Sequence, residues 1–568
     1  MNWFALPPGL ILIAGGIALP FFGPLGRRNI VLGFPFLTLV ALWSVPDGAA
    51  LSVDFMEYRI VLAEGDRLSR LFGTIFAIMA AAGGLFALGN ARTIELCASM
   101  IYAGSSIGVI FAGDLITLFV FWELMAVGST LVLWSAGTPE AYRASMRYLS
   151  IHLLGGVVLM GGIAAWTVST GGIEFGRMTE ALGGGGLRSV AAWLILGGFL
   201  LNAGAPPLSA WLPDAYPEAS PSGMVTLSAF TTKTAVYVLI VGFAGTELLV
   251  WVGLYMVFYG IVYALLENDM RRILAYSIVN QVGFMVTGIG IGTVMSLNGS
   301  AAHAFTHIIY KALLLMSAGA VLHMTGRRKC SDLGGLIQTM PLTATCGIIG
   351  ALAISSFPLT SGFISKSMIS QAAMDGHLTF VWLALAAASA GVFLHAGIKF
   401  PWFVFFQKDS GLRPPEPPRN MRIAMVIFAA LCIVLGIAPG MLYAILPAPV
   451  DYVPYTGEHV VAQLQLLLFS GLAFFVLLPL MKRTLTISLD WDWFYRRFGP
   501  LLVKVAGGAI LAADRAFRGA FLDFLRRGLD GIRTYYGPQS VAARSWNTAW
   551  MVLCAIAALG IYLAYLYA

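Results

Sequence analysis

Charged side chains are scarce in this 568-residue sequence, where Asp, Glu, Lys and Arg together make up 11% of the residues. An average soluble protein carries about 25%. So little charge over such a length excludes a soluble enzyme and a disordered chain. The net charge is +7 and is spread among short loops, which argues against a nucleic-acid-binding protein.

Cysteine is equally sparse, and no C-x-x-C pair occurs among Cys97, Cys330, Cys346, Cys432 and Cys554. Such wide spacing offers no cage for an iron–sulfur cluster or structural zinc, and no disulfide framework. The sequence also lacks a P-loop, so ATP does not drive this chain directly. We therefore expect no cofactor, no metal ion and no catalytic or redox site within this chain.

Long apolar stretches are what the sequence has in abundance, with 59% hydrophobic residues. About 20 apolar residues span a bilayer, and we place sixteen spans between 3–23 and 546–567. The runs are continuous rather than alternating, which excludes a β-barrel. No basic region precedes 3–23, so we interpret it as a span and not as a cleaved signal. The predicted fold class is an all-α polytopic membrane protein of about 16 transmembrane helices.

The charges of the predicted loops alternate from one side of the membrane to the other. One side receives acidic residues, namely Asp54, Glu57, Glu174, Glu180, Asp451 and Glu458. The other side receives basic residues, namely Arg27, Arg28, Arg92, Arg143, Arg271, Arg272, Arg327, Arg328, Lys329, Lys408, Arg413, Arg419, Lys482 and Arg483. Cytoplasmic loops collect Lys and Arg. We therefore predict a cell inner (cytoplasmic) membrane protein with both termini on the non-cytoplasmic side.

Two predicted spans are interrupted by proline, in NAGAPPLSAWLPDAYPEASPSG at 202–223 and SSFPLTSGFISKSM at 355–368. A broken helix at membrane depth persists only where protein or a wet cavity satisfies the freed backbone groups. The breaks share a PLSA/PLTS pattern and lie five spans apart, an odd offset that reverses the direction of the second copy. We predict two inverted five-helix repeats with an ion site at the breaks.

The end of the chain predicts an amphipathic lateral helix followed by a final span. Its apolar residues fall near one helical face and its arginines on others, which suits the cytoplasmic interface of a membrane; an ordinary linker helix is the alternative. The apolar face consists of Phe517, Phe521, Phe524, Leu525 and Ile532. The predicted segments are N-terminal spans at 1–92, half-channels at 93–245 and 246–406, C-terminal spans at 407–490, the lateral helix at 491–545 and the last span at 546–568.

Several ionisable residues fall inside predicted spans, where a central charge costs about 2.5–3.5 kcal/mol. Glu123 and Lys233 lie near mid-membrane, and Lys366 follows the second break. His303, His307 and Lys311 recur at i, i+4 and i+8, which puts them on one stripe of a helix. Residues so costly to insert favour a proton pathway, although each can instead be a structural group bonded to a neighbouring helix.

Three secondary candidates, His152, His395 and Lys399, lie within a turn or two of predicted helix ends, where a structural role is equally compatible. The paired histidines also raise the possibility of a metal site. No carboxylate or third histidine follows His303 and His307 at zinc spacing, so we predict a relay rather than a metal site.

A resemblance to a known family rests on six motifs: FVFWELM, AWLPDAYPEA, SAFTTKTAVY, ENDMRRILAYSIVNQVGF, HAFTHIIYKALLLMSAG and SSFPLTSGFISK. They resemble the antiporter-like subunits shared by respiratory complex I, membrane-bound hydrogenases and Mrp-type Na⁺/H⁺ antiporters. Their order and spacing agree throughout residues 67–406. SAGVFLHAGIKFPWFVFF is most similar to the D-type subunits of Mrp antiporters, and the lateral helix with its last span resembles the long complex I subunit.

The resemblance implies two inverted half-channels joined by charged residues and water at the membrane midplane. The family's proton-carrying positions correspond here to Glu123, Lys233, His303, His307, Lys311 and Lys366. The chain departs from the family at three positions: Asn202 replaces a lysine on the first broken helix, Arg271 stands in DMRR instead of DLKR or DIKR, and Gln281 replaces a histidine. Asn202 removes the basic partner of Glu123. We favour a replacement of that partner by Lys233, with Asn202 holding water. The alternative is a closed first half-channel, with transport carried by His303, His307, Lys311 and Lys366 alone.

The function we favour is an ion-translocating subunit of a multi-subunit monovalent cation/proton antiporter. Its expected partners are other membrane subunits, the lipid bilayer, protons and Na⁺ or K⁺, and no nucleic acid. One alternative is a proton-pumping membrane subunit of a redox complex, such as an NADH-quinone oxidoreductase or membrane hydrogenase. Others are a proton-coupled subunit of a bicarbonate-uptake complex, or a scaffold that has lost transport. The neighbouring subunits would separate these functions.

Overall fold

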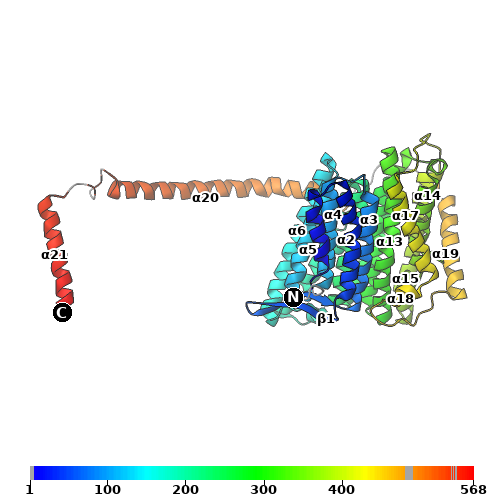
Figure 1. Cartoon of the computed structure of the whole chain (residues 1–568), viewed down its shortest axis with the longest axis horizontal. Helices are drawn as coiled ribbons and strands as arrows, with labels where there is room; N and C mark the ends of the chain where they lie inside the picture. Colours follow the sequence, from blue (N-terminus) through cyan, green and yellow to red (C-terminus); the bar gives the residue numbers. More distant parts are fainter. Residues whose placement is uncertain (1–5, 480–489, 539, 541–542, 544–545, 568) are drawn as a thin grey trace. The chain divides into compact units, whose positions relative to one another are not determined.

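The computed structural model describes residues 6–479, 490–538, 540, 543 and 546–567, and its chain forms two compact units, Met1–Asp492 and Trp493–Ala568. In the first unit, helices run side by side, with α13 between the N-terminal helices and α17 (Figure 1). The basic residues Lys482 and Arg483, expected at a cytoplasmic loop, lie outside the described residues.

The N-terminal part of the first unit consists of apolar helices joined by short loops, as the hydropathy predicts. These helices are α1 (Gly9–Ala18), α2 (Pro24–Ser44), α3 (Arg67–Ala87), α4 (Thr93–Phe111), α5 (Leu115–Trp134) and α6 (Pro139–Thr170). Side-chain caps begin several of them: the carboxylate of Asp66 accepts from the backbone of Ser69 at α3, and Asp114 accepts from Ile116 and Thr117 at α5.

A β-hairpin, which the sequence analysis did not predict, accompanies the helices. Strands β1 (Gly48–Phe55) and β2 (Tyr58–Gly65) pair antiparallel, and Met56 takes a left-handed conformation in the turn, with φ 53°. The sequence there alternates apolar and polar residues with the two-residue period of a strand. The hairpin joins the end of α2 to α3, and the backbone N–H of Val61 donates to the Asp114 carboxylate at 2.8 Å.

Both proline-rich breaks occur as predicted. Helix α7 (Gly186–Ala203) ends at Gly204 in the left-handed conformation, and the chain resumes in α8 (Trp211–Ala215). Helix α14 (Pro341–Ile354) stops before Pro358, and α15 (Ser361–Asp375) begins after it. The expected span at 339–373 is thus two short helices. The inverted relation of the two halves stays a prediction.

A third interruption was not predicted. The expected span at 222–245 divides into α9 (Pro221–Leu227) and α10 (Thr231–Phe243), with a bend at 228–230. Neither glycine nor proline lies at this bend, so the sequence carries no breaker signal there. Lys233 lies in the first turn after the bend.

Three segments form the interior of the first unit. Every residue is buried in the apolar 18-residue stretch of helix α12 (Met270–Ile291). In the corresponding stretches of α13 (Val294–Thr325) and of the α9–α10 pair, 94% of the residues are buried. Helix α13 contacts α3, α9, α10, α12, α14, α15 and α17. Polar residues on α13 are therefore surrounded by other helices and not by lipid.

The remaining helices lie around this interior. They are α11 (Glu247–Leu266), α16 (Thr379–Val392), α17 (Arg419–Ile437), α18 (Gly440–Tyr443) and α19 (Gly457–Val476). Two π-helical turns, η7 (Phe393–Lys399) and η8 (Trp402–Phe406), continue α16. The widened turns are associated with functional or strained positions.

Fourteen helices of the described residues are long and apolar enough to cross a membrane, against the sixteen spans expected. The difference arises from two shorter apolar helices, at Gly9–Phe21 and Pro341–Ile354.

The described residues of the second unit form the π-helical turn η9 (Phe494–Phe498) and two longer helices, α20 (Gly499–Tyr536) and α21 (Thr548–Tyr567), and neither longer helix has a buried residue. Helix α20 begins and ends inside the 491–545 segment predicted for the lateral helix. Its apolar face stays uncovered, with Phe517 72% and Phe524 71% exposed.

Candidate proton pathway

The stripe of ionisable residues on α13 is fully buried, with no exposed area on His303, His307 or Lys311. His303 Nδ1 lies 3.0 Å from Ser365 Oγ, and its Nε2 lies 3.2 Å from Gln281 Oε1. Tyr310 donates to Gln281 Oε1 at 3.1 Å. Gln281, a departure from the family's histidine, thus bonds directly to the stripe.

The buried lysines are held by neutral oxygen atoms. Lys233 Nζ donates to the carbonyl of Ser228 at 2.7 Å, beside the bend between α9 and α10. Lys366 Nζ donates at 2.8 Å to the carbonyl of Ile354, the last residue of α14. Each of these two lysines therefore caps a helix interruption.

Lys311 Nζ donates to Ser277 Oγ at 2.8 Å. Among the described residues, Lys233, Lys311 and Lys366 form no ion pair with a carboxylate. An ammonium group is expensive to bury without a counter-ion. This is the physical condition for a lysine that gains and loses a proton as its neighbours change charge.

The structure brings five of the six predicted pathway residues into one electrostatic neighbourhood. The charges of Lys233, Lys311 and Lys366 all act on His307, as does that of His303. His303 and His307 have ring centroids 6.2 Å apart. Lys233 therefore extends the α13 stripe toward the first half of the chain, and Lys366 extends it toward α15.

Glu123 stands apart from this group. It is half-buried on α5, packed so closely against α6 that a Cβ on Gly156 would come within 2.1 Å of its Oε1. Among the described residues, no ion pair joins Glu123 to Lys233, contrary to the partnership expected from the sequence. The reason is geometric, because the Lys233 amine is directed to the Ser228 carbonyl at the bend.

The secondary candidates separate into two kinds. His152 is buried against Tyr148 and Trp211, at centroid distances of 4.0 and 4.8 Å, and interacts with Asn202. Lys399 instead caps the end of α11, donating to the carbonyls of Ala264 at 3.1 Å and Glu267 at 2.6 Å.

Several buried polar atoms along the same path have no hydrogen-bond partner among the described residues. Both ring nitrogens of His307 are such atoms, and so are Glu123 Oε1, Ser356 Oγ, and Nε2 of His152 and of His395. Buried polar groups are normally bonded to protein or to ordered water. These positions are therefore suited to a hydrated path.

A cavity of about 170 Å³ adjoins Lys366. Its walls come from α15, α16 and the start of α19, and they include Ser367, Gln371, Ser389 and His459. The His459 ring stacks on Phe363 at a centroid distance of 4.5 Å. Because hydroxyl and amide groups line its walls, the cavity suits water.

Ion pairs connect the end regions of several helices and the loops between them. Arg147 pairs with Asp214 at 2.8 Å, and Arg328 pairs with Glu218 at 3.0 Å and Asp269 at 2.8 Å. Burial raises the pKa of the Asp269 carboxyl above its usual value, and the Arg328 charge opposes this shift. All these loops belong to the side predicted to be cytoplasmic.

Glu95, in the first turn of α4, is a buried carboxylate that sequence reasoning missed. It is 2% exposed and accepts hydrogen bonds from Ser222 and Ser135. Its position near a predicted helix end concealed it, because charges there are ordinary. Among the described residues, no group of three or more His, Cys, Asp or Glu residues is arranged to hold a metal ion.

Comparisons with known proteins identify what the chain is similar to. Residues 112–391 match the family described as NADH:quinone oxidoreductase/Mrp antiporter, TM. The D-type Na(+)/H(+) antiporter subunit of Alkalihalophilus pseudofirmus is 29% identical over 474 residues, covering 77% of this chain and 94% of the relative. A probable K(+)/H(+) antiporter subunit of Rhizobium meliloti is 31% identical over 357 residues, covering 60% of this chain. This chain spans 36% of that longer protein.

Solved structures share the fold. The Mrp complex from Dietzia sp. aligns with 98% of this chain and 62% of its own matched chain, at a TM-score of 0.73 and 22% identity. The membrane-bound sulfane sulfur reductase, an archaeal respiratory membrane complex, aligns with 82% of this chain and 98% of its own matched chain, at a TM-score of 0.68 and 23% identity. The sequence matches and the motifs within them lead to one conclusion: the chain belongs, through residues 112–391, to the NADH:quinone oxidoreductase/Mrp antiporter transmembrane family.

Proposed function

We propose that the chain is an ion-translocating subunit of a multi-subunit cation/proton antiporter, exchanging protons for Na⁺ or K⁺. The observation that carries the proposal is the buried series Lys233, Lys311, His307, His303 and Lys366, whose lysines form no ion pair with a carboxylate in the described part of the chain. A proton on one member raises the cost of a proton on the next, which drives stepwise transfer. The names of the antiporter relatives support the same activity.

In this mechanism Lys366 exchanges protons with water in the adjoining cavity, and the neighbouring Ser365 connects α15 to the stripe through His303 at 3.0 Å. His307 passes protons between His303 and Lys311. Glu123, His152 and Asn202 form a separate polar group in the first half, which takes protons from the other side. His395 lies near Lys311 and Lys366 and serves as a lateral acceptor.

The proposed setting is the cytoplasmic membrane, with other membrane subunits as partners. The ion pairs among Arg147, Asp214, Glu218, Asp269 and Arg328 support placing this end in the cytoplasm and both termini on the other side. The uncovered apolar face of α20 suits the lipid interface or a neighbouring protein.

The test is cation-dependent proton flux in inside-out vesicles that contain the complete complex. Lys311→Ala should abolish the pH change that follows addition of NaCl or KCl. Glu140→Gln is the matched control, since Glu140 is exposed in an ion pair with Arg143. Normal flux in Lys311→Ala would contradict the proposal. Flux that requires an electron donor would favour the redox-driven alternative, and purification would then yield redox subunits.

A further inference from the structure

Glu95 belongs to a polar cluster at the cytoplasmic end of the first half-channel. Its carboxylate accepts hydrogen bonds from Ser222 on α9 and, at 3.4 Å, from Ser135 at the end of α5. The guanidinium of Arg271 faces the same cluster, where it donates at 2.8 Å to the carbonyls of Ala219 and Ser220. Since Arg271 is fastened to these carbonyls, it holds the start of α9 against Glu95 and forms no direct ion pair with it among the described residues.

The cluster reaches the protein surface through Ser220. Ser220 is partly exposed, and its hydroxyl lies 3.3 Å from that of Ser222, which in turn donates to Glu95. Hydroxyl groups both donate and accept, so this sequence of contacts connects bulk water with a buried carboxylate.

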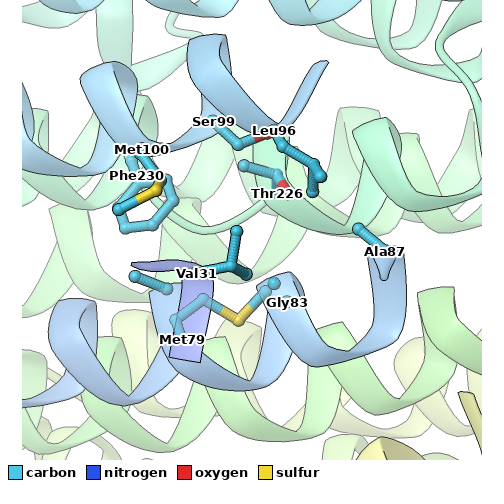
Figure 2. Close-up of a pocket in the computed structure, with 11 residues that line it drawn as sticks. Val31, Met79, Gly83, Ala87, Leu96, Ser99, Met100, Thr226 and Phe230 are labelled. Carbon is cyan, nitrogen blue, oxygen red and sulfur yellow. The ribbon is translucent and has the colours of Figure 1, made fainter. Parts of the chain in front are cut away.

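A small pocket lies beside the next turn of α4, one turn along the helix from Glu95. Ser99 follows Glu95 by four residues and Tyr102 by seven, so all three lie on one face of α4. Ser99 and Thr226 line the pocket together with Leu96, and Figure 2 shows these three gathered at one edge. The pocket measures about 20 Å³, enough for about one water molecule.

Tyr102, farther along the same face of α4, contacts the bend that holds Lys233. Its hydroxyl lies 2.6 Å from Thr231 Oγ1 and donates to the carbonyl of Leu227 at 3.4 Å. Lys233 donates to the next carbonyl, that of Ser228, and to Thr232 Oγ1 at 3.2 Å. Phe230, which lies between Ser228 and Thr232 in the sequence, lines the same pocket. The bend between α9 and α10 thus brings the two side chains to consecutive carbonyl groups.

We propose that Glu95 is the proton-loading carboxylate for Lys233 on the cytoplasmic side. The inference rests on the proposed function and adds the entry point of the first half-channel. Glu95 takes a proton from water at Ser220 and Ser222, and gives it to water in the Ser99–Thr226 pocket. That water passes a proton through Tyr102 and Thr231 to the amine of Lys233. The carboxylate left behind accepts the next proton, so the step balances without another reactant.

The experiment measures the initial rate of proton entry from the cytoplasmic face, in inside-out vesicles that hold the assembled complex. Glu95→Gln keeps the shape of the side chain but cannot carry a proton, so the rate should fall about 100-fold. Glu95→Asp retains the carboxyl group and should restore most of the rate. A structural role alone would predict the reverse, because Gln fits the site better than the shorter Asp.

A second pair of variants tests the pocket without touching the carboxylate. A Cβ added at Gly83 would lie 3.2 Å from Met79 Cε and 3.8 Å from Thr226 Oγ1, and all three residues line the pocket. Gly83→Ala should therefore slow entry about tenfold by excluding water. Gly33→Ala is the control, since its Cβ would meet no atom within 4 Å.

The outcomes separate this inference from the function on which it rests. Normal rates in Glu95→Gln or Gly83→Ala, measured beside inactive Lys233→Ala and Lys311→Ala, would overturn the role of Glu95 and leave the antiporter function standing. Normal rates in all four variants would overturn the function itself. If Glu95→Gln does not assemble, the rate of Gly83→Ala decides.

Discussion

The two helix interruptions hold their lysines in the same way but surround them differently. Lys233 and Lys366 each follow a helix interruption and donate to a backbone carbonyl at its edge. Around Lys233 the first half supplies hydroxyls, with the carboxylates Glu95 and Glu123 on other helices. Around Lys366 the second half supplies a polar cavity of about 170 Å³. In the proposed mechanism, this difference lets Lys366 exchange protons with water directly, whereas Lys233 depends on side chains that relay them.

The largest expected effect comes from removing either lysine. Lys233→Ala and Lys366→Ala should each lower cation-driven proton flux about 100-fold. Chemical rescue then sharpens the comparison, because ethylamine fits the cavity beside Lys366, whereas the pocket toward Lys233 holds about one water molecule. We expect added ethylamine to restore part of the flux in Lys366→Ala and none in Lys233→Ala. Equal rescue of both variants would erase the proposed difference.

Glu123 should matter next, through the first half alone. Glu123→Gln removes the titrating group from a site packed on Gly156 and should lower flux about tenfold. Asn202→Ala should be mild, whereas Asn202→Lys should be disruptive because it places a buried positive charge beside His152. The measurement is initial flux at equal amounts of assembled complex. Full activity in Asn202→Lys would show that the first half tolerates the charge.

Filling the Lys366 cavity should have a smaller effect. Ala386 lines the cavity, and Ala386→Leu should slow flux about threefold by displacing water. The neighbouring Ala387 is exposed, so Ala387→Leu is a control of equal size and hydrophobicity. The proton flux of both variants is measured from the rate of dye quenching at several sizes of the driving ion gradient. An unchanged rate in Ala386→Leu would remove the cavity from the pathway.

The smallest effect on flux is expected at Lys399, although its effect on stability should be clear. Lys399→Met breaks the bonds to the carbonyls at the end of α11 and should cost about 2 kcal/mol. The melting temperature of the purified complex should fall, while flux per folded complex stays near normal. A selective loss of flux would instead return Lys399 to the proton pathway.

Much of the fold follows from the sequence, because apolar length and proline act locally. The continuous apolar runs predict the spans, and the prolines at 206–207 and 358 predict the two broken helices. The bend at 228–230 contains neither glycine nor proline, so tertiary contacts and the Lys233–Ser228 bond must determine it. The hairpin at 48–65 was missed because its short strands were counted as a loop.

The candidate site was predictable in its members but not in its pairing. A central charge in an apolar run identifies Glu123, Lys233 and Lys366 without any structure. Which of them interact depends on how helices cross, and this pairs Lys233 with the α13 stripe rather than with Glu123. Glu95 escaped notice because burial near a helix end cannot be inferred from hydropathy.

The carbonyl bonds of Lys233 and Lys366 have a mechanical consequence. The end of a helix carries a partial negative charge, which a lysine ammonium group stabilises at α14 through Ile354. A proton that leaves Lys366 weakens that attachment, and a movement that pulls Ile354 away makes the proton easier to lose. The protonation of Lys366 and the position of the end of α14 are therefore coupled to each other. In the proposed mechanism, a displacement of α14 at the second break therefore changes how readily Lys366 gives up its proton.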